Sequence, residues 1–171
     1  MNKRYLNGTI CTEDNEDICH LTVILERDEI FETVFFTPLN QNLPYEKDAY
    51  PLAGSYAAEA IINRFKGDEN PVPHKSFTKT AFYASIFENL CKIKYGQTIT
   101  YKELALMCGR EKAARAVGNA LRVNPLPLIY PCHRIVATNG FGGFSGNHNE
   151  YIEIKKKLLE LEKKGKVFCI K

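Results

Sequence analysis

Alternating apolar and polar positions predict a β-hairpin early in the chain. Residues 20–26 place apolar side chains at every second position, as on one face of a strand. Residues 30–36 are rich in β-branched and aromatic side chains, and a polar turn at 27–29 joins the two segments. A helix over residues 55–65 follows, opened by a serine N-cap and stopped by Gly67. We therefore expect a small antiparallel sheet with one helix.

The later part of the chain shows helical periodicity instead. Apolar residues along 82–93 fall on one stripe of a helix. Thr100 and Glu103 have the spacing of a capping box, which opens a short helix. A glycine turn separates that helix from a second one over residues 111–122, and the pair forms a helix-turn-helix hypothesis. A further helix is expected over residues 150–164.

A polar, proline-broken stretch at residues 66–73 is the predicted domain boundary. We expect an α/β domain over residues 1–74 and a mainly helical domain over residues 75–171. The charge divides at the same place, with 6 Lys and Arg against 13 Asp and Glu before it, and 17 against 7 after it. A polyanionic partner for the basic half would explain this asymmetry, and so would a solvated lysine-rich helix.

The composition is typical of a soluble globular protein, with 44% hydrophobic and 25% charged residues. No apolar run approaches the roughly 20 residues that cross a bilayer, and no long apolar stretch follows the first residues, so we expect an intracellular protein without membrane contact. Six cysteines without dense spacing are expected to be free thiols. Cys11, Cys19, His20 and His74 match no compact zinc pattern, and whether they bind a structural zinc stays open.

The helix expected over residues 111–122 has little bulk on one side, where alanines surround Gly118. A glycine inside a helix costs about 1 kcal/mol relative to alanine, so a packing or access requirement is expected there. Arg115 and Arg122 project from this helix, which favours close approach to a nucleic-acid backbone over the alternative of tight helix packing.

Residues 124–136 combine three prolines with a Cys-His-Arg sequence. The prolines exclude a regular helix and stiffen the backbone. Cys132 lies beside His133 and Arg134, and cationic or hydrogen-bonding neighbours lower a thiol pKa, so a nucleophile is one interpretation and a chance dipeptide is the other. The glycine-rich residues 140–146 lack dinucleotide-binding spacing and are expected to form a tight loop facing a ligand.

Three segments together closely resemble the O6-alkylguanine-DNA alkyltransferases: Arg115-Ala116-Val117-Gly118, Asn124-Pro125 and Pro131-Cys132-His133-Arg134. The resemblance implies a ribonuclease-H-like α/β N-terminal domain and a helical C-terminal domain with a winged-helix-like helix-turn-helix. It implies irreversible, single-turnover transfer of a methyl or larger alkyl group from O6-alkylguanine in double-stranded DNA to Cys132, by a monomer that needs no cofactor and no metal. Activity on O4-alkylthymine, the preferred alkyl size and the compartment, cytoplasm or nucleus, stay open.

The resemblance also implies catalytic roles. Cys132 is the alkyl acceptor, and His133 draws off its proton through a water molecule. Glu162 in the last helix supports that histidine, and Asn124 braces the active-site turn. Tyr101 helps to extrude the nucleotide and hydrogen-bonds the departing guanine.

Binding roles follow from the same resemblance. Arg115 is implied as the finger that fills the vacated base stack from the minor groove. The implied DNA contacts are Arg115, Tyr101, Lys102, Arg110, Arg122 and Thr138. The implied base pocket is formed by Phe144, Ser145, Ile135 and Pro127. The chain is about four residues longer than the family pattern, through residues 147–150, which would alter the rim of the pocket.

Three other classes of protein are alternatives. A catalytically silent lesion-binding relative would lack the acceptor cysteine, whereas Cys132 is present. A sequence-specific helix-turn-helix regulator would need base-reading side chains, of which the alanine-rich helix offers few. A cysteine hydrolase would not require Arg115 or the smooth helix.

Overall fold

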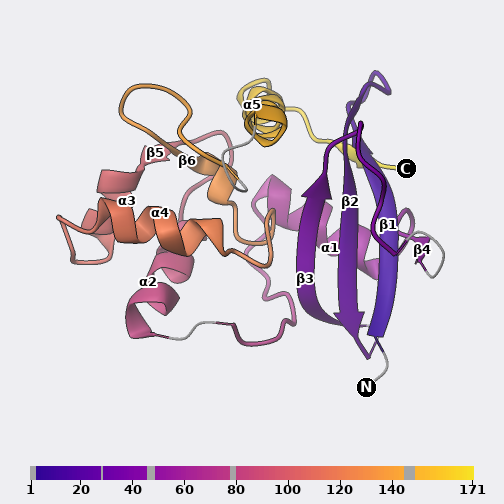
Figure 1. The fold of residues 1–171 in the computed structure, drawn as a ribbon. Helices are drawn as coiled ribbons and strands as arrows, with labels where there is room; N and C mark the ends of the chain where they lie inside the picture. The colour runs from indigo at the N-terminus through magenta and orange to yellow at the C-terminus, as the bar shows by residue number, and fades with distance from the viewer. Residues whose placement is uncertain (1–2, 28, 46–48, 78–79, 145–148) are drawn as a thin grey trace.

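Figure 1 shows the computed structural model of the chain. It describes residues 3–27, 29–45, 49–77, 80–144 and 149–171. Strands fill the first part of the chain and helices most of the rest, as the hydrophobic pattern predicts. The result is a mixed sheet with helices, and the predicted α/β class is confirmed at this level.

The main sheet has the strand order β3-β2-β1-β4, with β7 also paired to β1. The predicted hairpin is confirmed: β2 (Asp17–Glu26) and β3 (Ile30–Thr37) pair antiparallel. β1 (Lys3–Cys11) pairs antiparallel with β2. Two short strands complete the sheet, β4 (Tyr50–Pro51) parallel to β1 and β7 (Cys169–Ile170) antiparallel to it.

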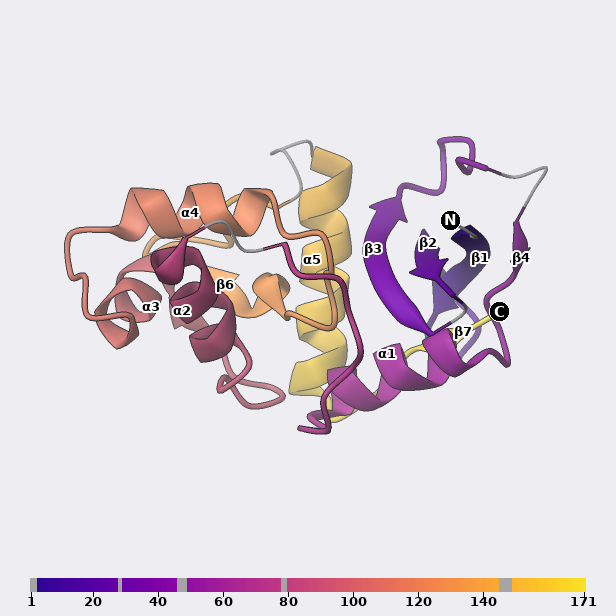
Figure 2. The ribbon, with the colours of Figure 1, turned by 90° about the horizontal axis from the view of Figure 1, so that it is seen from below.

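α1 (Tyr56–Lys66) covers one face of this sheet (Figure 2). The predicted caps are confirmed, because the Ser55 side chain accepts a hydrogen bond from the Ala58 N–H, and Gly67 ends the helix in the left-handed region at φ 100°. Ile61 and Phe65 on the inner side of α1 are fully buried, so the helix and sheet share one core.

In the described residues that follow, the α-helices are α2 (Ala81–Leu90), α3 (Tyr101–Met107), α4 (Ala114–Arg122) and α5 (Asn149–Lys163). The predicted capping box at the start of α3 is confirmed. Two predicted helices are shorter than expected. α2 ends at Leu90, and Ile93 is buried in the turns beyond it. α4 begins three residues late, because a turn closed by the Ala113 N–H and the Arg110 carbonyl precedes it.

α5 stands between the sheet and the group formed by α2, α3 and α4 (Figure 2). Two further short strands, β5 (Ile99–Thr100) and β6 (Ile135–Val136), pair in parallel within that group. The segment carrying Cys132 leads into β6 and lies against α5. No helix in the described ranges is both long and apolar enough to cross a membrane.

Candidate active site

Asn124 organises the turn that carries the candidate cysteine. Its Nδ2 donates to the Tyr130 carbonyl at 3.0 Å and to Cys132 Sγ at 3.2 Å, while its Oδ1 accepts from the Leu126 N–H at 3.0 Å. Leu128, in the middle of the turn, has a φ of 73°, which is strained for a branched side chain. One amide side chain therefore fixes both the turn and the position of the sulfur.

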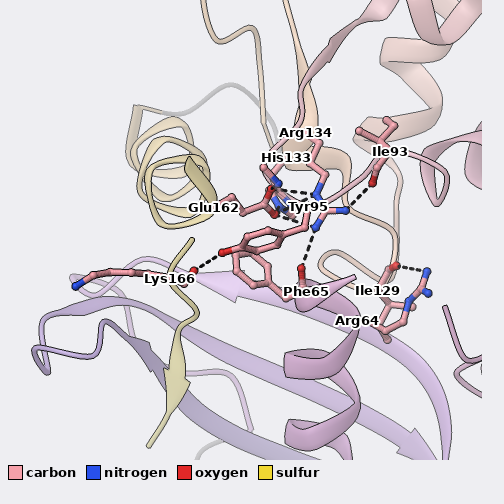
Figure 3. A network of polar contacts seen from close by, with 10 residues as sticks. Arg64, Phe65, Ile93, Tyr95, Ile129, His133, Arg134, Glu162 and Lys166 are labelled. Carbon is pink, nitrogen blue, oxygen red and sulfur yellow. Dashed lines mark hydrogen bonds and ion pairs between the residues drawn. The ribbon is translucent and has the colours of Figure 1, made fainter. Parts of the chain in front are cut away.

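The two residues that follow Cys132 in the sequence belong to a buried ionic network (Figure 3). Residues 132–134 form the 3₁₀ turn η1, and the next two side chains after Cys132 point to α5. His133 Nε2 lies 2.9 Å from Glu162 Oε1, and Arg134 Nε donates to both carboxylate oxygens at 3.0 and 3.2 Å. The Arg134 guanidinium also donates to the carbonyls of Ile93 and Phe65. All three charged or titratable side chains are less than 4% exposed, so the network is closed to solvent.

The network fixes the protonation of His133. Burial works to raise the pKa of Glu162, but the hydrogen bonds from His133 and Arg134 and the charge of Arg134 outweigh it and lower that pKa, so the carboxylate is ionised. An ionised carboxylate only accepts hydrogen bonds, so Nε2 of His133 must carry the proton. Burial lowers the pKa of His133, which keeps the ring neutral at rest. Nδ1 then has a free lone pair and is the nitrogen that is able to take up a proton.

Cys132 rests as a thiol. Burial raises its pKa, while the Asn124 hydrogen bond and the charge of Lys155 act in the opposite direction. The ammonium of Lys155 is itself fully buried and donates to the carbonyls of Ile135 and Phe141 at 2.5 and 2.6 Å. Reaction at this sulfur therefore needs a base, and a buried positive charge is available to stabilise the thiolate once it forms.

A cavity of about 540 Å³ opens onto Cys132. Its walls come from α3, α4, η1 and the loop before α5, and its described lining is Tyr101, Arg115, Gly118, Asn119, Leu121, Arg122, Cys132, Ala137, Gly142, Gly143 and Phe144. Burial raises the pKa of Tyr101, so its hydroxyl stays a donor, here to the Gly143 carbonyl at 3.2 Å. A side chain at Gly118 would meet the Tyr101 ring only at 3.8 Å, an ordinary contact, so packing does not require this glycine. The glycine keeps the cavity wall open.

The other residues implied as site residues lie elsewhere. Ile135 and Pro127 are buried but are not among the cavity lining. Lys102, Arg110 and Thr138 are exposed outside the lining. Ser145 and residues 147 and 148 lie outside the described residues, whereas positions 149 and 150 begin α5.

Sequence reasoning missed the buried positions of Arg134 and Lys155 at the site. Arg134 was expected only as a cationic neighbour that lowers the Cys132 pKa, but it pairs with Glu162 and the pKa of Cys132 is raised by burial. Lys155 lies seven residues, or about two helical turns, before Glu162 on α5, and this spacing alone puts both on one face. Lys155 is followed by further lysines, and a lysine-rich run is typical of a solvated face, so the sequence did not single out Lys155 as buried.

The described part of the chain contains no group of three or more His, Cys, Asp or Glu side chains placed to hold a metal ion. The residues considered for zinc are spread out. His20 Nδ1 contacts the Thr9 hydroxyl on β1, whereas His74 contacts the Tyr130 hydroxyl near the cysteine turn.

Lys155 is expected to make stability depend on pH. Burial lowers its pKa from 10.5 to about 8. Between these two values the unfolded chain binds more protons than the folded one, so this group's contribution to the free energy of unfolding rises with pH there and is constant below. Lys155→Met lacks this contribution. The free energy of unfolding is measured with urea at about pH 7 and about pH 9.5, and the difference between wild type and Lys155→Met should shift in favour of wild type at the higher pH. The same difference at both pH values would contradict a charged, buried Lys155.

A thiol held at a cavity wall, with a neutral histidine oriented by a buried carboxylate, defines a cysteine nucleophile site. The family model described as "6-O-methylguanine DNA methyltransferase, DNA binding domain" matches residues 81–164, which include this site. The crystal structure of Mycobacterium tuberculosis OGT in complex with DNA is 30% identical, with a TM-score of 0.67 over 95% of this chain and 94% of that one.

Curated relatives indicate the same family. Methylated-DNA--protein-cysteine methyltransferases are 42% identical in Metallosphaera sedula and 40% identical in Homo sapiens, over 60% and 56% of this chain. The matched part spans 63% and 46% of those relatives, less than two thirds of either. The chain belongs to the O6-methylguanine DNA methyltransferase family.

Proposed function

We propose that the protein repairs DNA by transferring a methyl or larger alkyl group from O6 of guanine to Cys132. The observation that carries the proposal is the Cys132 thiol, held by Asn124 at 3.2 Å and opening onto a cavity walled by the arginine-bearing helix α4. The M. tuberculosis relative whose structure contains DNA supports a DNA partner.

The chemistry needs only groups of this chain. The Cys132 proton passes to His133 Nδ1 through a water molecule, and the thiolate attacks the alkyl carbon from the side opposite to O6. The carbon–oxygen bond breaks, its electron pair goes to the guanine, and the Tyr101 hydroxyl hydrogen-bonds the base as negative charge develops there. The guanine anion takes up the proton held by His133, through water, so the products are unmodified guanine, a thioether and a neutral histidine. A thioether carries no ready leaving group, so each molecule reacts once.

The base must leave the duplex to reach the cysteine, which costs a few kcal/mol. Arg115 is exposed on α4 at the edge of the cavity and fills the vacated stack from the minor groove. Arg122 lines the same cavity. Lys102, Arg110 and Thr138, which are exposed, bind neighbouring phosphates in this proposal. In this proposal α3 and α4 form a winged-helix-like helix-turn-helix, and Phe144 with Ser145, Ile135 and Pro127 shapes the base pocket.

We further propose a boundary near residue 74, between a ribonuclease-H-like supporting domain and the DNA-binding domain. The division is supported by the change from strands to helices and by the change of charge. In this proposal the protein acts as a monomer.

The proposed function is tested by following the loss of O6-methylguanine from a duplex that carries one such base. Equal amounts of protein and duplex are mixed, and the nucleosides are separated by liquid chromatography. We expect one O6-methylguanine to become guanine per protein molecule, with no further loss when more duplex is added. Continued turnover would point to a hydrolase, and tight binding without loss of the methyl group would point to a lesion-binding protein or a regulator.

Arg115→Ala should separate extrusion from chemistry. Because Arg115 offsets the cost of opening the duplex, we expect its loss to slow repair of duplex DNA by about tenfold or more, for a few kcal/mol of extrusion cost. Reaction with the free base O6-benzylguanine should change little. The matched control is Lys112→Ala, which removes an exposed positive charge just before α4. Equal losses on the duplex and the free base would contradict the finger role.

A further inference from the structure

Two cysteines far apart in the sequence meet at the edge of the main sheet. Cys11 ends β1 and Cys169 begins β7, and they are directly paired in the antiparallel register. Their sulfur atoms lie 3.0 Å apart. Cys11 is buried, whereas Cys169 is exposed. Neither thiol belongs to the cavity around Cys132.

The backbone holds this pair in place. The Thr9 N–H donates to the Lys171 carbonyl at 2.7 Å, and the Lys171 N–H donates to the Thr9 carbonyl at 3.0 Å. A Cβ at Gly8 would lie 2.9 Å from Ile170 Cγ2, so glycine at residue 8 lets β7 approach β1 without crowding. Directly paired residues in antiparallel strands have Cα atoms about 4.5–5.5 Å apart, inside the range that a disulfide spans.

We propose that Cys11 and Cys169 form a modification site at which a peroxide converts the two thiols into a disulfide. The exposed Cys169 sulfur attacks the peroxide, the oxygen–oxygen bond breaks, one water molecule leaves and a sulfenic acid forms. The Cys11 sulfur then attacks Cys169, the sulfur–oxygen bond breaks and a second water molecule leaves. Two thiols are oxidised, one hydrogen peroxide is reduced, and both thiol hydrogens end in water.

The environment of the two sulfurs sets this order. Burial, together with the hydrogen bond and charge of Cys169, raises the pKa of Cys11 to about 11, although Lys171 acts to lower it. Cys11 is therefore a poor first nucleophile. A sulfenic acid at Cys169 removes the competing thiolate charge, so the second step becomes easier once the first has occurred.

The disulfide would link the segment after α5 covalently to β1 of the sheet. Phe168, next to Cys169, packs against Phe65 with ring centroids 4.6 Å apart, and Phe65 stacks on His133 at 5.8 Å. The Tyr95 hydroxyl donates to the Lys166 carbonyl in the same segment (Figure 3). The disulfide at this site thus stabilises the packing behind His133 and forms no bond to Cys132.

The test treats the reduced full chain with hydrogen peroxide and maps its peptides by mass spectrometry without reductant. We expect a cross-linked peptide that contains Cys11 and Cys169, lighter by two hydrogens than the separate peptides. It should form in Cys108→Ser, the matched control, and be absent from Cys11→Ser and Cys169→Ser. The oxidised protein should melt about 5–10 °C higher than the reduced one.

Two results would overturn the proposal. One is Cys169 accumulating as a sulfinic or sulfonic acid with no link to Cys11. The other is cross-linking spread over the remaining cysteines at similar yield. The experiment contains no DNA, so its outcome is independent of the proposed alkyl transfer.

Discussion

Replacing Cys132 by serine is expected to abolish alkyl transfer while leaving the fold and the DNA affinity in place. A serine hydroxyl is nearly the size of a thiol, and Asn124 is able to donate to it as it donates to the sulfur. A hydroxyl is a far weaker nucleophile at neutral pH, and loss of a catalytic nucleophile costs many orders of magnitude. We expect the single-turnover rate on an O6-methylguanine duplex to fall at least about 10⁴-fold.

The measurement pairs single-turnover kinetics with a binding titration on the same duplex. Cys108→Ser is the control, because Cys108 is a partly buried thiol of the same half of the chain that does not line the cavity. It should react at the wild-type rate. Comparable transfer by Cys132→Ser, or loss of transfer in Cys108→Ser, would contradict Cys132 as the acceptor.

Glu162→Ala is expected to produce the largest loss of stability. The Glu162 carboxylate is 3% exposed and accepts from His133, from Arg134 and from the Gly96 N–H at 2.9 Å. Its removal leaves the Arg134 guanidinium buried without its counter-ion. Breaking a buried ion pair in this way costs about 3–5 kcal/mol, so the melting temperature should fall by roughly 6–20 °C.

Glu160→Ala is the matched control, because Glu160 is an exposed carboxylate two residues earlier on α5. Its melting temperature should stay near that of wild type. Glu162→Gln keeps the shape and one accepting oxygen, so its loss of stability should be intermediate. Its transfer rate should fall because an uncharged oxygen holds the His133 ring less strongly and stabilises its protonated form less. Equal melting temperatures for the alanine variants at 160 and 162 would contradict the buried network.

The sequence predicted the elements that follow from local rules. The hairpin, the serine and glycine caps of α1 and the capping box of α3 depend on residues close together in the chain, and all are confirmed. The two-residue strands β4 and β7 were not predicted, since they exist only because β1 supplies a partner from far away in the sequence. The start of α4 was placed too early because no side chain caps that helix.

In the candidate site, too, local sequence predicted the residues that stand close together in the chain and not those set by tertiary packing. Cys132, His133 and Asn124 stand close together in one unusual segment, so motif and resemblance led to them. Glu162 follows from the family pattern alone, and its contact with His133 is a matter of how α5 crosses the turn. Lys155 looked like one lysine among several, since only tertiary packing distinguishes a buried ammonium from a solvated one.

The mass of the protein itself tests the central claim most directly. Wild-type protein is incubated with an equal amount of duplex carrying one O6-methylguanine, and both the intact chain and its peptides are weighed. We predict a gain of one methyl group per molecule, located on the peptide that contains Cys132 and on none of the other five cysteines. An unchanged protein mass while the DNA loses its methyl group, or a methyl group found on a different residue, would contradict the account.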